Sequence, residues 1–271
     1  MAGGLSVRKE VSNLQPQELD ALRDGYARMM AISGDDNRSW IYWASQHGFQ
    51  NWYCWHYDRP GLGQRTPFSL FLPWHRAYLL YFDHSVRDQN EQAILPWWDW
   101  TSTLSHSAGV PASYATPSVS GGSANPLYSG PMPSIQGASA RQTIRFPGDP
   151  SQLPTDAQVQ GLMTLGDFVD FSNQLEDIHD GVHGWTGGTN PANPNQGGDM
   201  GNVGLAAYDP IFWAHHCMID RIWYLWQLRN GNNSVPQNYL NQALAPFGVT
   251  VASVLDIQTL GYQYAGSEVS T

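Results

Sequence analysis

Residues 206–227 read AAYDPIFWAHHCMIDRIWYLWQ and carry a strong helical signal. Asp209 is a favourable N-cap residue, and Pro210 suits the first position of a helix. Apolar residues then recur every three or four positions. The pattern therefore predicts a helix over about 210–228 that is buried on most of its surface.

Two adjacent histidines, His215 and His216, lie in the middle of this apolar helix. On a helix, His216 shares one face with Phe212, Asp220 and Trp223. A buried polar group without a partner costs about 1–3 kcal/mol, so an imidazole among aromatic rings needs one. That partner is either a hydrogen-bond acceptor, such as Asp220 or a backbone carbonyl, or a metal ion.

Composition limits the classes of function. The chain has 271 residues, which suits one large domain or two small ones, and its net charge is −10 without any run of Lys or Arg. A nucleic-acid partner is therefore not expected, and no apolar stretch is long enough to predict a membrane span. The N-terminus lacks a charged-then-apolar leader, so we expect a cytoplasmic protein by default; a secreted mature form remains compatible.

The remaining sequence alternates between helical patterns and long loops. The stretch 101–160 is rich in Ser, Gly and Pro, and we expect it to wrap the core with short strands near 141–147. Residues 179–202 are predicted as loop after a short turn that bears histidines. The further helices are expected over 15–33, 37–47, 73–90 and 155–176. The fold class is therefore mainly α: a four-helix bundle with long wrapping loops, few short strands and a site between facing helices.

Five other histidines support the metal interpretation of the paired histidines. His179 and His183 are four residues apart, a spacing that directs both imidazoles to one point on a helix. His47, His56 and His75 precede them in the chain. Each could have a structural role alone, but two groups of three imidazoles with few carboxylates suit copper or zinc rather than magnesium or calcium.

Several motifs together resemble those of the type 3 copper proteins, the family of tyrosinases, catechol oxidases and molluscan haemocyanin units. The strongest are FLPWHRAYLLYFD (71–83), IHDGVHGW (178–185) and the segment 198–227, which contains the His-His helix. VRKEVSNLQPQELDALRDGY (7–26) is similar to the opening of haemocyanin-like members. LGYQY (260–264) resembles the tyrosine motif that ends the family's catalytic domain.

The resemblance implies a bundle that holds two copper ions between its helices, with dioxygen as co-substrate. The implied ligands are His47, His56 and His75 for the first copper and His179, His183 and His216 for the second. Most members carry the middle ligand of the first copper nine residues before the PWHR histidine, where this chain has Thr66. We therefore assign His56 and interpret residues 57–66 as an insertion, which loops tolerate at small cost.

Further residues take roles by the same resemblance. Cys54 and His56 match a Cys-x-His pair that is joined by a thioether bond in fungal and molluscan members. Glu176 matches the glutamate that holds a water near the second copper, and Asp180 replaces an asparagine thought to help that water accept a phenolic proton. Asp180→Ala is therefore expected to lower monophenol oxidation more than diphenol oxidation.

Gly184 and Val203 occupy positions at the substrate mouth, and both are small, which predicts an open mouth. Asp83 and Asp220 are the expected partners that fix the tautomers of the copper ligands from behind. We expect residues 1–271 to form a single tyrosinase-like catalytic domain without a C-terminal shielding domain.

The expected function is that of a copper-dependent phenol oxidase that converts o-diphenols, and also o-aminophenols, to quinones and hydroxylates monophenols at the ortho position. The expected partners are a small phenolic substrate and a copper-delivery protein. One alternative is a haemocyanin-like module that binds dioxygen reversibly, favoured by the similarity of 7–26 and by the Cys-x-His pair. Another is a redox-inert zinc or structural protein that has lost its first copper site.

Overall fold

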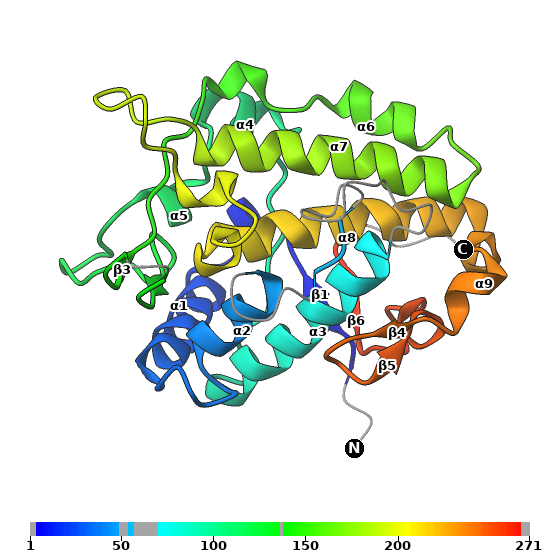
Figure 1. Ribbon diagram of the computed structural model, residues 1–271, viewed down its shortest axis with the longest axis horizontal. Coiled ribbons are helices and arrows are strands. Elements are labelled where there is room, and N and C mark those ends of the chain that lie inside the picture. The colour runs from blue at the N-terminus through cyan, green and yellow to red at the C-terminus, as the bar shows by residue number, and fades with distance from the viewer. Residues whose placement is uncertain (1–3, 49–53, 57–69, 136–137, 267–271) are drawn as a thin grey trace.

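The computed structural model describes residues 4–48, 54–56, 70–135 and 138–266 (Figure 1). Its α-helices are α1 (Pro16–Ala31), α2 (Trp40–His47), α3 (Phe71–Gln89), α4 (Thr103–Ala108), α5 (Ala112–Ala115), α6 (Asp156–Leu162), α7 (Phe168–Gly187), α8 (Ile211–Asn230) and α9 (Gln237–Leu240). The 3₁₀ turns are η1 (Val11–Asn13), η2 (Pro150–Gln152), η3 (Asp199–Gly201), η4 (Ala206–Tyr208), η5 (Asn232–Ser234) and η6 (Val251–Val254). The strands are β1 (Ser6–Arg8), β2 (Pro131–Met132), β3 (Arg141–Gln142), β4 (Ala243–Leu244), β5 (Val249–Thr250) and β6 (Tyr262–Tyr264). The predicted class, mainly α with few short strands, is confirmed.

Helix α8 lies at the centre of the core because it is apolar on nearly every side. Its first turn is held by Asp209, whose Oδ1 accepts a hydrogen bond from the backbone N–H of Ile211 at 3.1 Å. The helix ends at Gly231, where φ is +76° and glycine is the residue that adopts such a conformation without strain. The predicted bounds of 210–228 therefore agree with the structure to within two residues.

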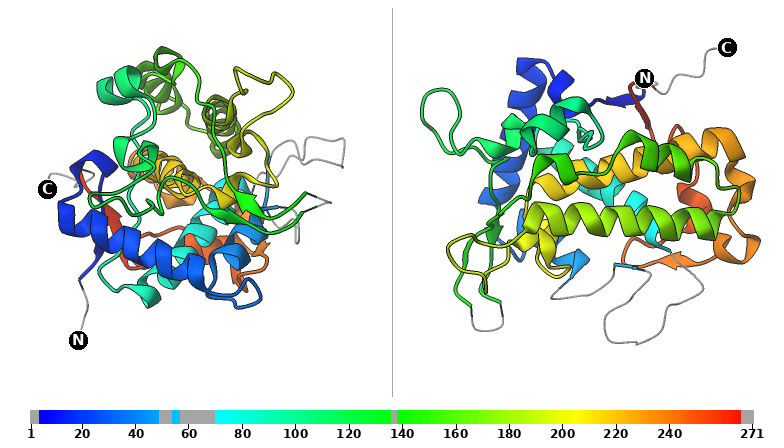
Figure 2. Two further views of the ribbon diagram at one scale, coloured as in Figure 1. Left: turned by 90° about the vertical axis from the view of Figure 1, so that its left-hand side faces the viewer. Right: turned by 90° about the horizontal axis from the view of Figure 1, so that it is seen from above.

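Four helices, α2, α3, α7 and α8, carry all of the candidate metal-binding histidines except His56. Figures 1 and 2 show α7 and α8 side by side, and α3 contacts both of them as well as α1. Aromatic rings fill the space between the helices; Phe82 of α3 stacks on Trp213 of α8 with ring centroids 3.3 Å apart. The predicted bundle with long wrapping loops is thus the observed architecture.

The structure corrects the expected helix over 155–176, which is divided into α6 and α7. Asp167 begins α7 by accepting hydrogen bonds from the backbone N–H groups of Val169 and Asp170 at 2.8 and 3.0 Å. The helix then continues through both histidines of HDGVH as far as Gly187. The prediction that 179–202 is loop after a short turn is therefore wrong for residues 179–187.

The long segment between α5 and α6 wraps the bundle, as expected, and contains the paired strands β2 and β3. Its later part, residues 141–148, runs beside the end of α7. Phe146 N–H donates to the carbonyl of Gly187 at 2.8 Å, and Gly148 N–H donates to that of Trp185 at 2.9 Å. This stretch was predicted as strand near 141–147; only Arg141–Gln142 pairs as one.

The strands β1 and β6 pair in parallel and bring residues from both ends of the described chain to α8. Asp220 of α8 is the buried centre of this contact. Its carboxylate accepts hydrogen bonds from Arg76 Nε at 2.5 Å and from the hydroxyls of Tyr262 and Tyr264 at 2.7 and 2.6 Å. Arg8 of β1 lies 3.6 Å from the same carboxylate. Across the described residues, none of the helices combines the length and apolarity that a membrane span requires.

Candidate metal centre

The first cluster consists of His47, His56 and His75, which come from three separate parts of the chain. His47 is the last residue of α2, His75 lies near the start of α3, and His56 belongs to the short described stretch 54–56. Their rings are buried, and the three centroids are 5.4–5.5 Å from one another. The expected insertion at 57–66 lies outside the described residues.

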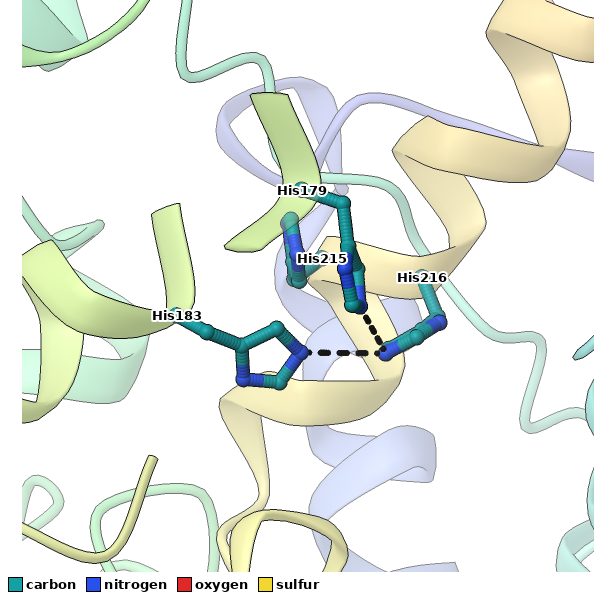
Figure 3. Close-up of side chains that lie close together, drawn as sticks. All are labelled: His179, His183, His215 and His216. Carbon is teal, nitrogen blue, oxygen red and sulfur yellow. Dashed lines mark hydrogen bonds between the residues drawn. The ribbon is translucent and has the colours of Figure 1, made fainter. Parts of the chain in front are cut away.

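The second cluster contains His179 and His183 of α7 and His216 of α8 (Figure 3). The Nε2 atom of His216 lies 3.2 Å from the Nε2 atoms of both other histidines. Imidazole nitrogens bind zinc at about 2.0–2.1 Å, so two nitrogens at a tetrahedral angle around an ion of that size are roughly 3.3 Å apart. The observed separations therefore match those of a chelated first-row ion.

The two clusters adjoin each other across the bundle. The rings of His75 and His216 stack with centroids 4.4 Å apart and an interplanar angle of 17°. The centroids of His56 and His179 are 5.5 Å apart. Ligand atoms of His47, His75 and His216 all lie within 4.8 Å of one another. Ions bound by the two clusters would therefore be immediate neighbours.

Backbone carbonyls fix the tautomers of three clustered histidines. A carbonyl can only accept, so the Nδ1 atom facing it must carry the proton, and Nε2 is left as the metal-binding atom. The three hydrogen bonds are His47 to Val203 (2.9 Å), His75 to Phe71 (2.9 Å) and His183 to Met200 (2.8 Å). Among the described residues, the Nε2 atoms of His47, His56 and His75 have no hydrogen-bond partner although they are buried.

Two other clustered histidines face carboxylates. His179 Nδ1 lies 2.9 Å from Asp180 Oδ1, and His56 Nδ1 lies 3.4 Å from Glu176 Oε1. Asp180 is largely exposed, whereas Glu176 is buried. Because both carboxylates face Nδ1, they leave the Nε2 side of each imidazole open to a metal ion.

Burial keeps most of the clustered imidazoles neutral. It lowers the pKa of His47, His75, His179 and His216 well below 6.5, and neighbouring imidazoles lower it further. Burial also lowers the pKa of His183 to about 4. Neutral imidazoles are the form that binds a metal ion.

His56 differs from these histidines. Burial acts to lower its pKa, but hydrogen bonds with Cys54 and Glu176 outweigh burial and raise the pKa to about 10. A metal ion at Nε2 would have to displace a proton from this imidazole, so metal binding at the first cluster would release a proton.

The expectation that Asp83 and Asp220 fix the histidine tautomers does not agree with the structure. Asp220 binds Arg76 and the two tyrosines of β6, and Asp83 Oδ1 accepts the backbone N–H of Leu95 at 3.3 Å. Asp220 is one turn beyond His216, but its carboxylate turns toward the buried arginines, whose charge also lowers its pKa against the opposing effect of burial. The partners of the histidine Nδ1 atoms are instead backbone carbonyls, Asp180 and Glu176.

His215 also lies against the second cluster, although the resemblance assigns the ligand role to His216 of the pair. Its ring is fully buried, stacks on His179 with centroids 5.2 Å apart and meets His183 edge-on at 4.9 Å (Figure 3). It offers a nitrogen within 4.8 Å of ligand atoms on His179, His183 and His216.

A cavity of about 180 Å³ opens onto both clusters. Its rim includes Gly184, where an added Cβ would meet no described atom within 4 Å, and the half-buried Val203. A 150 Å³ protein cavity can hold benzene, so this one has room for a single aromatic ring. The described residues that line it are His47, His56, Glu176, His179, Asp180, His183, Gly184, Met200, Gly201 and Val203.

A helical bundle that gathers two triads of buried imidazoles beside a ring-sized cavity defines a dinuclear metal protein. The common central domain of tyrosinase matches residues 37–229, which is more than half of the chain. The chain therefore belongs to the tyrosinase family of type 3 copper proteins, which includes the haemocyanins. Membership implies two copper ions and dioxygen, and the imidazole donor set and the Nε2 spacing fit copper.

Known relatives come from both branches of the family. Haemocyanin units G and H of Sepia officinalis are 28% identical over 241 residues, covering 87% of this chain and 40% of that protein. A tyrosinase of Streptomyces glaucescens is 30% identical over 202 residues, covering 64% of this chain and 68% of the enzyme. The chain thus spans less than half of the Sepia protein, and it spans 56% of the Helix pomatia haemocyanin unit.

Solved structures show the same fold. Tyrosinase from Burkholderia thailandensis at high pH matches with a TM-score of 0.83 and 21% identity, over 98% of this chain and 75% of that one. A functional unit from octopus haemocyanin matches with a TM-score of 0.74 and 24% identity, over 97% and 69%. At these identities the likeness establishes the architecture alone.

Proposed function

We propose that the protein is a copper phenol oxidase that uses dioxygen to oxidise o-diphenols, and also o-aminophenols, to quinones and quinone imines. In the diphenol reaction, two substrate molecules give two quinones while one dioxygen becomes two waters. The observation that carries this proposal is the ring-sized cavity that opens onto both histidine triads. We further propose that monophenols are hydroxylated at the ortho position in the same cavity.

In this proposal His47, His56 and His75 hold one copper ion, and His179, His183 and His216 hold the other. The copper pair would supply the binding and reduction of dioxygen. The support for these ligands is that the Nδ1 atoms of five of the six rings already have partners, which leaves Nε2 to the metal. A protein that binds fewer than two copper ions per chain would contradict the assignment.

The chain itself would position the substrate ring and receive its proton. Gly184 and Val203 leave the cavity rim open, so a phenol can enter edge-first toward the imidazoles. Glu176 and Asp180 line the same cavity and are the carboxylates that could accept a phenolic proton, directly or through water. Asp180 is the more exposed of the two, so a proton received there can pass to solvent.

Reversible dioxygen binding, as expected of a haemocyanin-like module, is the second candidate function. The similarity to haemocyanins extends over 87–96% of this chain in four of the relatives, further than the similarity to tyrosinases. An oxidase should consume dioxygen in proportion to the quinone that it forms. A carrier should instead bind dioxygen and release it unchanged under reduced pressure.

A parallel assay separates these functions. The chain is loaded with copper, the copper per chain is counted, and rates are measured on a monophenol, an o-diphenol and an o-aminophenol. We expect two copper ions and turnover of the o-diphenol at the highest rate. A protein that binds two copper ions and dioxygen but turns over none of the three substrates would be a carrier.

We also propose a thioether bond between Cys54 Sγ and the His56 ring. The thiol is buried beside the imidazole and hydrogen-bonds with it. Bond formation would remove one hydrogen from sulfur and one from a ring carbon, and dioxygen would take up both hydrogens with two electrons to give hydrogen peroxide. Bound copper would supply the redox chemistry for this step. Mass mapping of the peptide 52–59 from copper-loaded protein should show the loss of two hydrogens, whereas an alkylatable thiol at Cys54 would contradict the bond.

A further inference from the structure

The loop of residues 198–204 (GDMGNVG), here called the carbonyl loop, contacts both histidine clusters. The carbonyl of Met200 accepts the Nδ1 proton of His183 at 2.8 Å, and the carbonyl of Val203 accepts that of His47 at 2.9 Å. His183 belongs to one triad and His47 to the other. A single short loop therefore orients one imidazole in each triad.

The carbonyl loop is seated directly on the ends of two helices. A Cβ added at Gly187, the last residue of α7, would clash with the backbone of Gly201. A Cβ added at Gly48, just after α2, would clash with the backbone of Gly204. The loop can approach both histidine-bearing helices only because no side chain separates it from them.

A buried carboxylate anchors this loop. Asp199 receives two hydrogen bonds from Arg141, at 2.7 and 2.6 Å, and a third from the backbone N–H of Ile144 at 2.7 Å. The Asp199 N–H in turn donates to the carbonyl of Ile144 at 2.9 Å. A bidentate guanidinium–carboxylate pair fixes orientation as well as distance, so these contacts define where the loop begins.

The segment that supplies these contacts, residues 141–148, also holds the two main helices of the second cluster. It donates two backbone hydrogen bonds to carbonyls at the end of α7. Arg145 Nε lies 3.0 Å from Asp209, the buried residue that begins α8. Residues 141–148 therefore connect the carbonyl loop to the end of α7 and to the start of α8.

We propose that Asp199, held by Arg141, is a positioning residue for both copper sites. Through the carbonyls of Met200 and Val203 it fixes the orientation of one imidazole in each triad, so its loss loosens both ions together. This inference rests on the two three-histidine copper sites proposed above. Asp199 contacts neither a clustered histidine nor the cavity, and it acts only through the loop.

The test variant is Asp199→Asn, which keeps the size of the side chain but replaces the oxygen pair that receives Arg141 and the Ile144 N–H. A second variant, Arg141→Gln, removes the anchor from the half-exposed side and leaves Asp199 hydrogen-bonded to Ile144. Each protein is loaded with copper and mixed with excess chelator, and the absorbance of the copper–chelator complex follows the release of both ions. The unfolding temperature of each metal-free protein is measured in parallel.

Two variants serve as controls. Asp36→Asn removes an exposed ion pair of similar geometry, in which Arg38 Nε and Nη2 lie 3.0 and 2.6 Å from the carboxylate, and should leave copper release unchanged. Gly25→Ala places a methyl group on α1 at 2.9 Å from the nearest atom of Val86. This contact lies away from the histidine clusters, so the variant should lower the unfolding temperature without acting on the metal centre directly.

Asp199→Asn is expected to release both copper ions roughly ten-fold faster than the parent, and Arg141→Gln to accelerate both by a smaller factor. Acceleration of one ion only, or of neither, would overturn the inference. It would also be overturned if Gly25→Ala released copper as fast as Asp199→Asn at an equal loss of unfolding temperature. A parent chain that fails to bind two copper ions would instead contradict the proposed function.

Discussion

The two ring nitrogens of each clustered histidine have different tasks. Nδ1 faces a fixed acceptor in five of the six rings, and three of these acceptors are backbone carbonyls. A backbone carbonyl remains when the side chain of its residue is substituted, so these three tautomers should withstand most substitutions at Phe71, Met200 and Val203. His179 and His56 are the exceptions, because Asp180 and Glu176 hold them through side chains that can be replaced.

Asp180 combines a structural and a chemical contact, and two substitutions separate them. His179 Nδ1 lies 2.9 Å from Asp180 Oδ1. Asp180→Asn keeps a side-chain oxygen that can accept from this nitrogen, but it removes the carboxylate at the cavity rim. Because the resemblance gives an asparagine at this position a part in accepting the phenolic proton through the water held by Glu176, Asp180→Asn is expected to keep monophenol oxidation close to that of the parent.

Asp180→Ala removes every polar atom of this side chain, so monophenol oxidation is expected to fall by roughly ten-fold or more and diphenol oxidation by much less, since general bases typically contribute 10²–10⁴-fold. This variant is also expected to hold copper about ten-fold more weakly, because His179 loses its acceptor. Initial rates on a monophenol and an o-diphenol, normalised to the copper bound, measure both effects. Equal losses on the two substrates in Asp180→Ala would contradict a role for Asp180 in accepting the phenolic proton.

At the level of residues, the sequence predicted which histidines would meet but not what would hold them. His179, His183 and His216 follow from helical spacing and from the family motifs. The carbonyls of Met200 and Val203 could not be predicted, because every residue has a carbonyl and only the fold decides where it points. The sole signal was the density of glycines in 198–204, which indicates close backbone approach.

At the level of elements, the difference between prediction and structure is concentrated in α7. Glycines at 181, 184 and 187 each disfavour a helix by about 1 kcal/mol relative to alanine, so the sequence was interpreted as loop. The structure offsets this cost because the last turn packs against the carbonyl loop and the segment 141–148. Local propensity alone cannot reveal such tertiary support.

The contact between Gly48 and Gly204 gives an element-scale prediction. Gly48→Ala places a methyl group against the Gly204 backbone, and overpacking of this kind typically costs about 1–3 kcal/mol. Because Val203 lies next to Gly204, the displacement should also lengthen its hydrogen bond with His47. A lower unfolding temperature and weaker binding of copper are expected.

Gly161→Ala in α6 is the matched control, because an added Cβ there meets no described atom within 4 Å. That substitution should leave stability unchanged or raise it, since alanine favours a helix over glycine. Thermal unfolding and copper titration of both variants test the prediction. If Gly48→Ala is tolerated as well as Gly161→Ala, the close approach does not constrain the loop.

At the scale of the whole molecule, the metal centre lies where distant parts of the chain converge. Its histidines span positions 47 to 216, and the strand pair β1–β6 joins the two ends of the described chain to the back of α8. Metal ions that bind only the folded state stabilise such an arrangement by mass action. Without metal ions, the converging imidazoles remain buried together, and burial disfavours the protonated form of most of them.

This burial predicts how the stability of the metal-free protein depends on pH. Burial lowers the pKa of five clustered histidines in the folded state (His47, His75, His179, His183 and His216). In the unfolded chain their pKa is about 6.5, so the unfolded state binds more protons below that pH, and stability falls as the pH falls. His56 has the opposite sign: its pKa of about 10 contributes stability below pH 6.5 that is lost as the pH rises through 10.

The five lowered groups outnumber the one that is raised, so the free energy of unfolding should decrease between pH 7.5 and pH 5. Each lowered histidine can contribute up to about 1.4 kcal/mol per pH unit below pH 6.5, until its own folded pKa is reached. For His183 this range extends to about pH 4. Urea unfolding of the metal-free protein at several pH values measures the slope, and His183→Gln should reduce it. A free energy of unfolding that stays constant from pH 7.5 to pH 5 would mean that the clustered imidazoles take up protons without unfolding the chain.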